Sequence, residues 1–305
     1  MISVSILSHK VIMNISVIIP HRNSVQYLPK LLGSIPVSEQ IEIIIVDNSP
    51  EPIQAQQIRS DRKFTLLYSA PQRGAGGARN VGIEHASGKW LVFADADDFF
   101  ADNAFERFND YLDSDAEVVF FSMSGVFQET GEHSKRGDMF TELVQGYLNG
   151  KWDEYDLRLR YSSPCAKMVR KELVDRHHLR YDEVIAGNDR YFSVLSGYYA
   201  KKIEAEDTVV YVATVTAGSL TQRHEYEVMY SRLKVLVRCN YFLRQHHLGK
   251  YQISIMNWML HAIKARPTSI FRIIGLLLKY KQSPFIGITG WLKTAWNYRK
   301  NTEKA

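Results

Sequence analysis

The chain has 305 residues, of which 45% are hydrophobic, so it can bury the core of one large α/β domain plus a further region, and general disorder is excluded. Its net charge of +5 is unevenly distributed: residues 225–305 contain 14 Lys and Arg against 3 Asp and Glu, whereas residues 1–224 contain 24 against 30. The two cysteines, Cys165 and Cys239, lack metal-ligand spacing, which argues against a zinc site or a disulfide framework. No signal peptide opens the chain, and no apolar stretch reaches the ~18 residues that cross a bilayer. We therefore expect a cytoplasmic protein, or one that attaches to a membrane without crossing it.

The first two predicted strands both end in polar residues. We expect the fold to begin at Met13, and residues 15–19 predict a buried strand that ends at Pro20, before a helix with leucines at helical spacing. Residues 41–46 predict a second buried strand, which runs directly into Asp47. Because the carboxyl ends of parallel strands face ligands in α/β proteins, Asp47 is a candidate ligand contact. An Asx turn or a helix cap explains it about equally well.

A glycine-rich segment follows the third predicted strand, residues 64–69. Residues 73–83 contain four glycines, which allow close backbone approach, and a helix beginning near Ala78 would present its amide groups to this loop. The dinucleotide fingerprint G-x-G-x-x-G fails, because Arg79 stands where the third glycine is required. The Lys-Ser/Thr pair of a P-loop is also absent. The segment therefore disfavours a nicotinamide enzyme and a P-loop hydrolase.

Three carboxylates occupy four positions after the fourth predicted strand, residues 90–94. They are Asp95, Asp97 and Asp98, and burying them without a cation would be costly. Mg²⁺ or Mn²⁺ prefers one or two carboxylates together with substrate phosphate oxygens, so the cluster predicts a phosphorylated substrate. The alternative is an acidic surface turn that caps a helix over residues 102–112.

Four segments in this order and spacing resemble the signatures of family 2 glycosyltransferases: residues 15–23, 41–49, 77–88 and 91–98. The resemblance covers roughly residues 13–224, which we expect to form the catalytic domain. It implies an α/β GT-A fold, similar to a Rossmann fold, with a mixed, mainly parallel sheet flanked by helices. It also implies inverting transfer of a sugar from a nucleotide diphosphosugar.

The resemblance implies a role for each matched residue. Asp47 matches the aspartate that contacts the base, Asp95 the acid near the ribose, and Asp97 the metal ligand that bridges to the diphosphate. Arg79 would support the nucleotide side, although tying Asp47 or Asp95 in place is an equally good structural role. The implied nucleotide-sugar contacts are Pro20, Arg22, Asp47, Arg79, Asp95, Asp97 and Arg223, and the implied ligands of Mn²⁺ or Mg²⁺ are Asp97 and His224. Two departures leave the nucleotide open: Arg22 stands where the family usually has an aromatic residue, and Asn48 where it usually has a second aspartate.

The acceptor side is implied by two later segments. Residues 180–192 resemble the family segment that carries the catalytic base, and Asp189 aligns with that base, which would deprotonate an acceptor hydroxyl. A simple acidic residue at a helix start is the alternative. Lys167 occupies a recurrent family position, where a solvated cation or a partner for nearby carboxylates is at least as good an interpretation. Arg223 and His224 lie in a segment that often folds over the diphosphate, and an exposed loop tip is the alternative.

The basic tail, residues 225–305, is predicted to be helical. Thr268 or Ser269 can cap an apolar helix with a basic end, and aromatic and basic residues follow from Pro284 onward. This composition suits an anionic membrane surface on the cytoplasmic face of the inner membrane. The alternative is a helical hairpin packed on the catalytic domain or on a partner subunit, which allows for a homo-oligomer.

The sequence thus favours an inverting, metal-dependent glycosyltransferase that moves a sugar, most simply from a UDP-sugar, to a hydroxyl of a glycan or lipid-linked acceptor in bacterial surface polysaccharide assembly. A processive synthase is disfavoured because spanning helices are lacking. A noncatalytic glycan- or membrane-binding protein of the same fold is the alternative from another class, but it has no need of Asp95, Asp97 and Asp189 together. A nucleic-acid partner is not expected, because the basic residues are interleaved with aliphatic runs.

Overall fold

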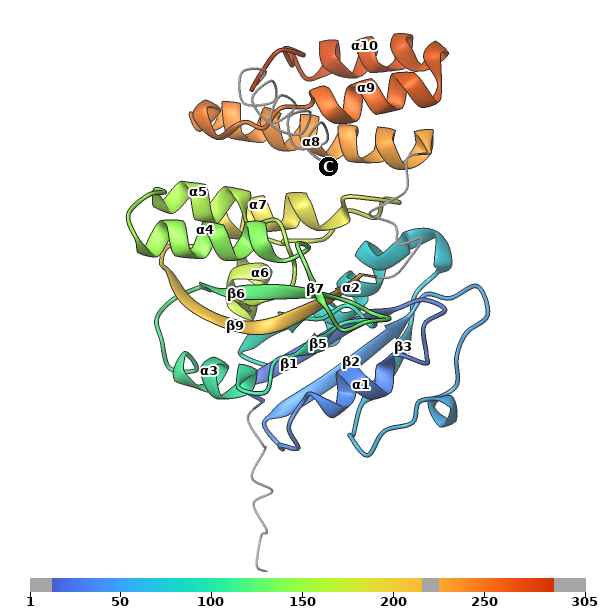
Figure 1. Ribbon diagram of the computed structural model, residues 1–305, viewed down its shortest axis with the longest axis vertical. Helices are drawn as coiled ribbons and strands as arrows, with labels where there is room; N and C mark the ends of the chain where they lie inside the picture. The colour runs from blue at the N-terminus through green and yellow to red at the C-terminus, as the bar shows by residue number, and fades with distance from the viewer. Residues whose placement is uncertain (1–12, 216–224, 288–305) are drawn as a thin grey trace, which may run out of the picture.

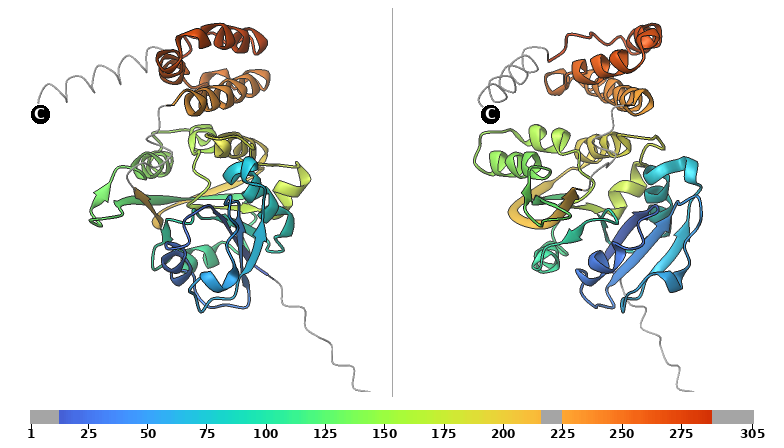
Figure 2. Two further views of the ribbon diagram at one scale, coloured as in Figure 1. Left: turned by 90° about the vertical axis from the view of Figure 1, so that its right-hand side faces the viewer. Right: turned by 45° about the vertical axis from the view of Figure 1, so that its right-hand side comes forward.

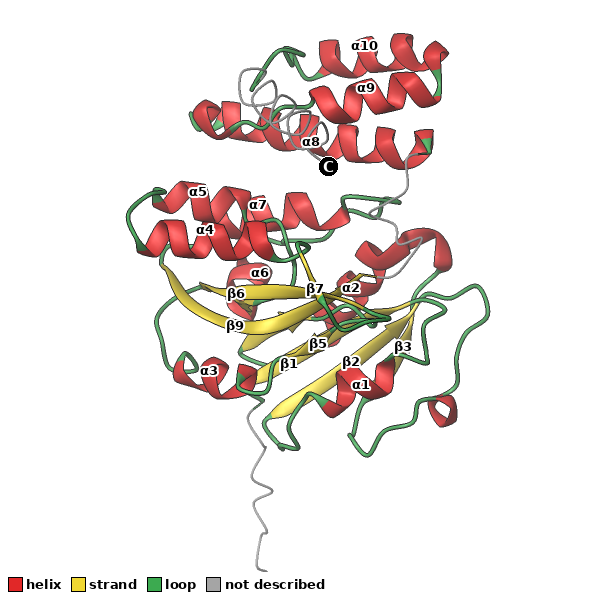
Figure 3. Ribbon diagram, viewed as in Figure 1, coloured by secondary structure: helices red, strands yellow, loops and turns green. Residues whose placement is uncertain are grey.

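The computed structural model describes residues 13–215 and 225–287, and its centre is a single mixed sheet (Figure 3). The strands follow the order β3-β2-β1-β4-β8-β6-β9-β5, and β7 pairs with β6. Their bounds are β1 Ile15–His21, β2 Ile41–Asp47, β3 Thr65–Tyr68, β4 Trp90–Phe93, β5 Phe99–Phe100, β6 Val118–Phe127, β7 His133–Ser134, β8 Lys167–Arg170 and β9 Ile203–Val215.

The helices cover the sheet and add further layers on one side of it (Figure 1). Their bounds are α1 Leu28–Gly33, α2 Gly74–His85, α3 Ala104–Asp110, α4 Asp138–Leu148, α5 Glu154–Arg160, α6 Lys171–Arg176, α7 Asn188–Tyr199, α8 Tyr226–Gln245, α9 Met256–Ala265 and α10 Ile270–Lys279, with short 3₁₀ turns at Ala55–Gln57, Pro71–Arg73, Gly249–Tyr251 and Pro267–Ser269. Helix α2 packs on β1, β2 and β3, and α4 packs on β6 and β9. Helix α7 packs on α5 and also contacts α8, so the layers are continuous from the sheet to the C-terminal helices.

The first four strands of the sheet are parallel, so their carboxyl ends share one edge. In the register, His21 lies opposite Asp47, and Phe93, the last residue of β4, lies opposite Ile18. The apolar runs that predicted β1 and β4 are buried on both faces, as expected for parallel strands covered by helices, whereas the edge strand β3 is partly exposed. The expected mixed α/β sheet with flanking helices is therefore confirmed. Beyond β4 the parallel character is interrupted, because β8 runs antiparallel to both β4 and β6.

The last strand in the chain, β9, covers Ile203–Val215, because β6 pairs with most of it in parallel and β5 pairs with its second half. One predicted boundary was wrong for a tertiary reason. Helix α2 begins at Gly74 rather than near Ala78. The glycines therefore lie inside a helix, where their lack of a side chain allows another segment to approach closely.

The helices α8, α9 and α10 form a layer beyond α4, α5 and α7, and two further views show the same stacking (Figure 2). One apolar cluster joins these three helices with Ala186, and a second joins α8 to α5 and α7 through Leu159, Val194 and Leu243. Ser269 does precede α10, but its side chain makes no cap and its Oγ donates instead to the carbonyl of Ala262 at 3.4 Å. None of the described helices is both long enough and apolar enough to cross a bilayer.

Candidate active site

Arg79 connects the acidic cluster after β4 to the start of α7. Its Nη2 donates to Asp95 Oδ1 at 2.5 Å, and its Nη1 donates to Asn188 Oδ1 at 2.8 Å. Burial opposes the charge of this guanidinium, but the carboxylate of Asp95 raises its pKa. Of the two roles considered for Arg79, holding Asp95 in place is the one that the structure contains.

The glycines of α2 make this connection possible. A Cβ added to Gly76 would lie 2.0 Å from the carbonyl oxygen of Asp182, which no side chain can occupy. Asn80 completes the contact, because its amide donates to the carbonyl of Tyr181 at 3.0 Å and its Oδ1 accepts from the Tyr181 amide at 2.8 Å. The glycine-rich segment therefore positions α2 against residues 181–183, the segment that leads into α7.

The three carboxylates after β4 have different environments. Asp98 is buried and accepts hydrogen bonds from Tyr211 Oη at 2.9 Å and from the Thr214 amide at 2.7 Å. Burial, together with the charges of Asp97 and Asp95, raises its pKa to about 8. Asp98 therefore ties the turn to β9, whereas the Asp95 side chain remains 30% exposed.

Asp97 fits a divalent cation better than its two neighbours do. It is half-buried, and both burial and the charge of Asp95 raise the pKa of its carboxyl. A hard cation would relieve this excess negative charge, and a carboxylate oxygen is a suitable ligand. Within the described ranges no group of three His, Cys, Asp or Glu side chains converges on one point. The remaining ligands would thus have to include substrate oxygens or residues outside those ranges, where the predicted Arg223 and His224 lie.

Arg136 was not predicted, yet it lies beside this cluster. Its Nη1 donates to the carbonyl of Thr214, and although burial opposes the charge, Asp98, Asp95 and Asp97 together raise its pKa. The pairing of β7 with β6 brings Arg136 to the site, and no local pattern in the sequence contains that information.

Asp47 lies at the same edge of the sheet but is 1% exposed. Oδ1 accepts from His21 Nδ1 at 2.8 Å and from Ser49 Oγ at 2.6 Å, and Oδ2 accepts from the Ile53 amide at 2.9 Å. Burial works against the charge, but these bonds lower its pKa. The alternative role considered for Asp47, hydrogen bonding within a turn, is therefore present in the structure. Contact of Asp47 with the base of the nucleotide stays a prediction. Beside it, Asn48 Nδ2 is buried and has no hydrogen-bond partner among the described residues.

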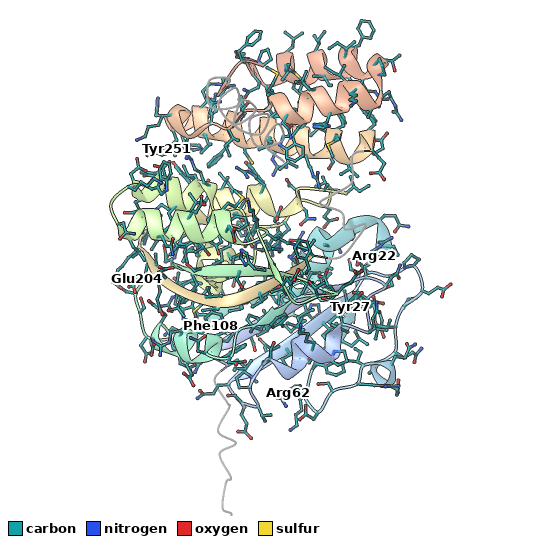
Figure 4. All side chains as sticks on the ribbon, in the orientation of Figure 1. Arg22, Tyr27, Arg62, Phe108, Glu204 and Tyr251 are labelled. Carbon is teal, nitrogen blue, oxygen red and sulfur yellow. The ribbon has the colours of Figure 1, made fainter. Side chains whose placement is uncertain are left out.

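Pro20 and Arg22 lie at the end of β1. Pro20 is a buried residue of the strand, opposite Val46. Arg22 is exposed (Figure 4), and its Nη1 donates to the carbonyls of Asn48 at 3.2 Å and Pro71 at 3.0 Å. Arg22 thus bridges the ends of β1 and β2 to the segment before α2, and its cation remains at the edge where the nucleotide is predicted.

Asp189 lies in the first turn of α7, at the wall of a cavity of about 330 Å³. Gly187, which precedes the helix, has a φ of 77°, a left-handed conformation that favours glycine. No ion pair to the Asp189 carboxylate occurs in the part of the chain that the structure describes. Burial raises its pKa, and Arg79 acts in the opposite direction. A carboxylate with unused acceptor capacity beside a cavity can take a proton from a bound hydroxyl.

Lys167 is not solvated, so that interpretation was wrong. The residue is 1% exposed, and its Nζ donates to Ser193 Oγ at 2.9 Å. Burial lowers its pKa to about 7, although Asp189 acts in the opposite direction. Lys167 begins the central strand β8, and this position places it beneath α7 rather than at the surface.

The C-terminal helices complete the cavity beside Asp189. The sequence did not predict this contribution to the site. Arg232 of α8 and Trp258 of α9 line it together with Arg190 of α7. The guanidinium carbon of Arg232 lies 5.0 Å from the centre of the Trp258 ring. The sequence indicated helices here, but the residues of their inner face become visible only once α8 is packed on α7.

A mixed sheet with an acidic turn after its fourth strand, facing a second carboxylate on a later helix, defines a glycosyltransferase of the GT-A fold. Residues 16–177, more than half of the chain, match Glycosyl transferase family 2, and the chain belongs to this family of transferase enzymes. The protein EpsH of Bacillus subtilis, named as a glycosyltransferase, is 24% identical over 247 residues, which cover 76% of this chain and 70% of EpsH.

Two further similarities concern proteins with stated ligands. The poly(ribitol-phosphate) β-N-acetylglucosaminyltransferase TarS of Staphylococcus aureus is 25% identical over 286 residues, covering 88% of this chain, which spans only about half the length of TarS (47%). The crystal structure of TarS residues 1–349 with UDP-GlcNAc has a TM-score of 0.61 at 20% identity, covering 88% of this chain and 80% of that one. The mannosyltransferase PcManGT of Pyrobaculum calidifontis with GDP-Man and Mn²⁺ has a TM-score of 0.54 at 16% identity, covering 87% and 79%.

Proposed function

We propose that this protein is an inverting, metal-dependent glycosyltransferase that moves a sugar from a UDP-sugar to a hydroxyl of a glycan or lipid-linked acceptor in bacterial surface polysaccharide assembly. The observation that carries the proposal is the pair of separate carboxylate sites joined by Arg79. Asp95 and Asp97 lie at the end of β4, and Asp189 lies at a cavity on the other side of Arg79 and Asn188. The UDP-GlcNAc complex of TarS supports a uridine nucleotide, and the Mn²⁺ in PcManGT supports a metal.

In the proposed mechanism, each side of the site has one task. Asp97 and His224 would hold Mn²⁺ or Mg²⁺, which when bound offsets the charge of the departing diphosphate. Arg79 fixes Asp95, and the exposed Arg22 is available to the nucleotide. Asp189 takes the proton of the acceptor hydroxyl as that oxygen attacks the anomeric carbon from the opposite face. A single in-line displacement inverts the configuration.

The donor side of the proposal is tested by replacing Asp97. We expect Asp97→Ala to abolish the Mn²⁺-dependent binding of UDP in isothermal titration calorimetry, while its melting temperature stays close to that of the unmodified protein. Asp113→Ala is the matched control, because the Asp113 side chain is fully exposed and pairs with Lys89, which precedes β4, whereas the acidic cluster follows β4. Equal UDP affinity in the Asp97 variant, or binding that a chelator does not affect, would remove Asp97 from the metal site.

Peripheral membrane attachment at the cytoplasmic face is supported by a separate observation on α10. Phe271, Ile274 and Leu278 form an exposed apolar stripe on this helix, with 78%, 46% and 72% of their surface exposed, whereas Ile273 is 1% exposed on the opposite face. Arg272 and Lys279 flank the stripe, and residues 256–287 contain five Lys and Arg and no acidic residue. An apolar face beside basic side chains suits an anionic lipid surface, and would place the active site near a lipid-linked acceptor.

A further inference from the structure

The cavity beside Asp189 has two different walls. One is formed by the start of α7 and contributes the side chains of Asp189 and Arg190; the other is formed by α8 and α9 and contributes Arg232, Val235, Leu236 and Trp258. Its volume of about 330 Å³ is that of a small ligand site rather than a packing defect. Because it contains the predicted general base, an inference about its occupant rests on the proposed function of Asp189.

The charge of this cavity is unusual for a site that receives a neutral sugar. Of the described residues that line it, two are arginines and one, Asp189, is an acid. The nearest further acids in sequence, Glu183 and Asp182, already pair with Arg73 at 2.6 Å and with Arg238 at 2.8 Å, respectively. Guanidinium groups therefore outnumber carboxylates at the place where the acceptor hydroxyl has to lie.

Arg190 in particular forms no ion pair with any of the residues that the structure describes. Its Nε is buried and has no hydrogen-bond partner among the described residues, and no ion pair joins it to Asp189, the next residue along the helix. Burial lowers its pKa, and the neighbouring Arg160 acts in the same direction, against the effect of Cys239 and Asp189. A guanidinium whose Nε is buried without a hydrogen-bond partner is costly, and a phosphate or carboxylate group is the ligand that matches its geometry.

Arg232 and Trp258 make the opposite wall suitable for the rest of such a ligand. Burial also lowers the pKa of Arg232, while the charge of Asp189 opposes the shift. The Trp258 ring lies beneath the guanidinium of Arg232. This ring and the aliphatic side chains of Val235 and Leu236 form an apolar surface of the kind on which the faces of sugar rings pack. The two arginines would also offset the repulsion that Asp189 exerts on a negatively charged acceptor.

We propose that this cavity is an acceptor subsite for a saccharide that carries an anionic group, a phosphate or a carboxylate. Arg190 and Arg232 bind the anionic group, Trp258 contacts the carbon skeleton, and a neighbouring hydroxyl is thereby placed at Asp189. The C-terminal helices are then part of the specificity of the enzyme, because they supply Arg232 and Trp258.

The test compares three small probes that share one pyranose ring and differ in the group at C6: glucose with a neutral hydroxyl, glucose 6-phosphate with a phosphate, and glucuronate with a carboxylate. Their dissociation constants are measured by ligand-observed NMR on the full chain, with and without saturating UDP and the diamagnetic ion Mg²⁺, so that a phosphate cannot be mistaken for a donor-site ligand. We expect both anions to bind about tenfold more tightly than glucose, the usual order for a charge-assisted pair. Tighter binding of the phosphate would indicate a phosphorylated acceptor, and tighter binding of glucuronate an acidic sugar.

Three variants locate the effect. Arg190→Gln and Arg232→Gln should each reduce the affinity for the anions to that for glucose, whereas Lys234→Gln, which removes an exposed cation from the same helix, should leave it unchanged. If Arg190→Gln fails to fold, as judged by its melting temperature, the half-buried Arg232 still decides the question. Asp97→Ala should not alter the affinity for the anions, because the donor site is separate.

Equal affinity of the unmodified protein for all three probes would overturn the proposal, as would anion binding that both arginine variants retain. Anion binding that disappears in Asp97→Ala or on addition of UDP would assign the anion to the donor site and would also overturn it. Failure of the proposed function is distinguishable, because it appears as a lack of UDP binding with Mn²⁺. The arginine dependence of anion binding in the absence of UDP is still measured in that case.

Discussion

Asp189 is the residue whose environment bears most directly on catalysis. Asp189→Asn keeps the shape of the side chain but cannot accept a proton, so we expect transfer to fall by ~10²-fold or more while UDP binding is retained. Because burial raises the pKa of Asp189, the rate of the unmodified enzyme should also fall as the pH drops through that raised value. Both are measured as initial rates of UDP release with an acceptor present. Glu183→Gln, an exposed carboxylate that pairs with Arg73 at 2.6 Å, is the control, and near-normal turnover of Asp189→Asn would reject the assignment.

Lys167 leads to a prediction about stability and pH. Its pKa is lowered from 10.5 to about 7 by burial, so between these values the unfolded chain holds a proton that the folded chain does not. The free energy of unfolding therefore rises with pH across this window, by at most ~1.4 kcal/mol per pH unit from this residue. Lys167→Met removes that titration. The difference in melting temperature, unmodified minus variant, should increase from about pH 7 to about pH 9.

The exposed Lys63 supplies the comparison for this experiment, since Lys63→Met should give a difference that does not depend on pH. A flat difference for Lys167→Met would mean that its ammonium group stays protonated inside the folded protein. In that case Ser193, the hydrogen-bond acceptor of Lys167 Nζ, would hold a charged group beneath α7.

Helix α10 exposes its apolar stripe, although the apolar side of an amphipathic helix is normally covered by other protein or by lipid. Replacing Phe271 and Leu278 by serine removes two apolar side chains that would enter the interface, worth roughly 2–4 kcal/mol together. We expect the double variant to lose at least ~10-fold in co-sedimentation with anionic vesicles at low salt, and the unmodified protein to lose most of its binding at high salt. Val37→Ser changes an equally exposed apolar residue (80% exposed) on the catalytic domain and should have no effect.

Other outcomes of the vesicle experiment identify other occupants of the stripe. A full-length protein that never sediments with anionic lipid would reject the membrane proposal. A change of oligomeric state in the double variant, seen by light scattering, would instead assign the stripe to contacts between copies of the chain. The opposite face of α10 packs on α8 and α9, within the C-terminal region, and a hairpin packed on the catalytic domain or on a partner subunit stays a prediction.

The catalytic and helical regions, predicted as residues 13–224 and 225–305, are joined by extensive contacts. Lys250 and Tyr251, between α8 and α9, both bind Asp153 before α5, with Tyr251 Oη 2.7 Å from Asp153 Oδ2. Figure 4 labels Tyr251 between the two layers. Burial opposes ionisation of Asp153, but hydrogen bonds from Tyr251 and Lys250 lower its pKa to about 2. The interface thus has both an apolar part, around Leu243, and a polar part.

We therefore expect the two regions to unfold together. Differential scanning calorimetry should show one transition whose calorimetric and van 't Hoff enthalpies agree. Leu243→Ala, which opens a cavity between α8 and α7, should lower that transition as a whole, with a loss of about 2–5 kcal/mol. Leu148→Ala, at a position that is 48% exposed, is the control. Two separate transitions, of which Leu243→Ala affects only one, would mean that the helical region unfolds as an independent unit.

The sequence by itself determined the features that depend on local patterns. The buried runs of β1, β2 and β4, the acidic turn after β4 and the segment that contains Asp189 are each contained in a few consecutive residues, so periodicity and motif spacing were enough to predict them. The same holds for the helical character of the tail. These predictions succeeded because strand burial, turn chemistry and helix amphipathicity have direct signatures along the chain.

Only the tertiary structure decided which of these residues meet. The bond from Arg79 to Asn188 joins positions 109 residues apart, and its geometry depends on Gly76 bringing α2 against residues 181–183. Arg136 reaches the acidic cluster through a pairing of two short strands, and Lys167 is buried because β8 lies in the middle of the sheet. The cavity that Arg190 and Arg232 line exists only where α8 packs on α7. Contacts of this kind depend on the packing of distant segments, for which one sequence contains no local signal.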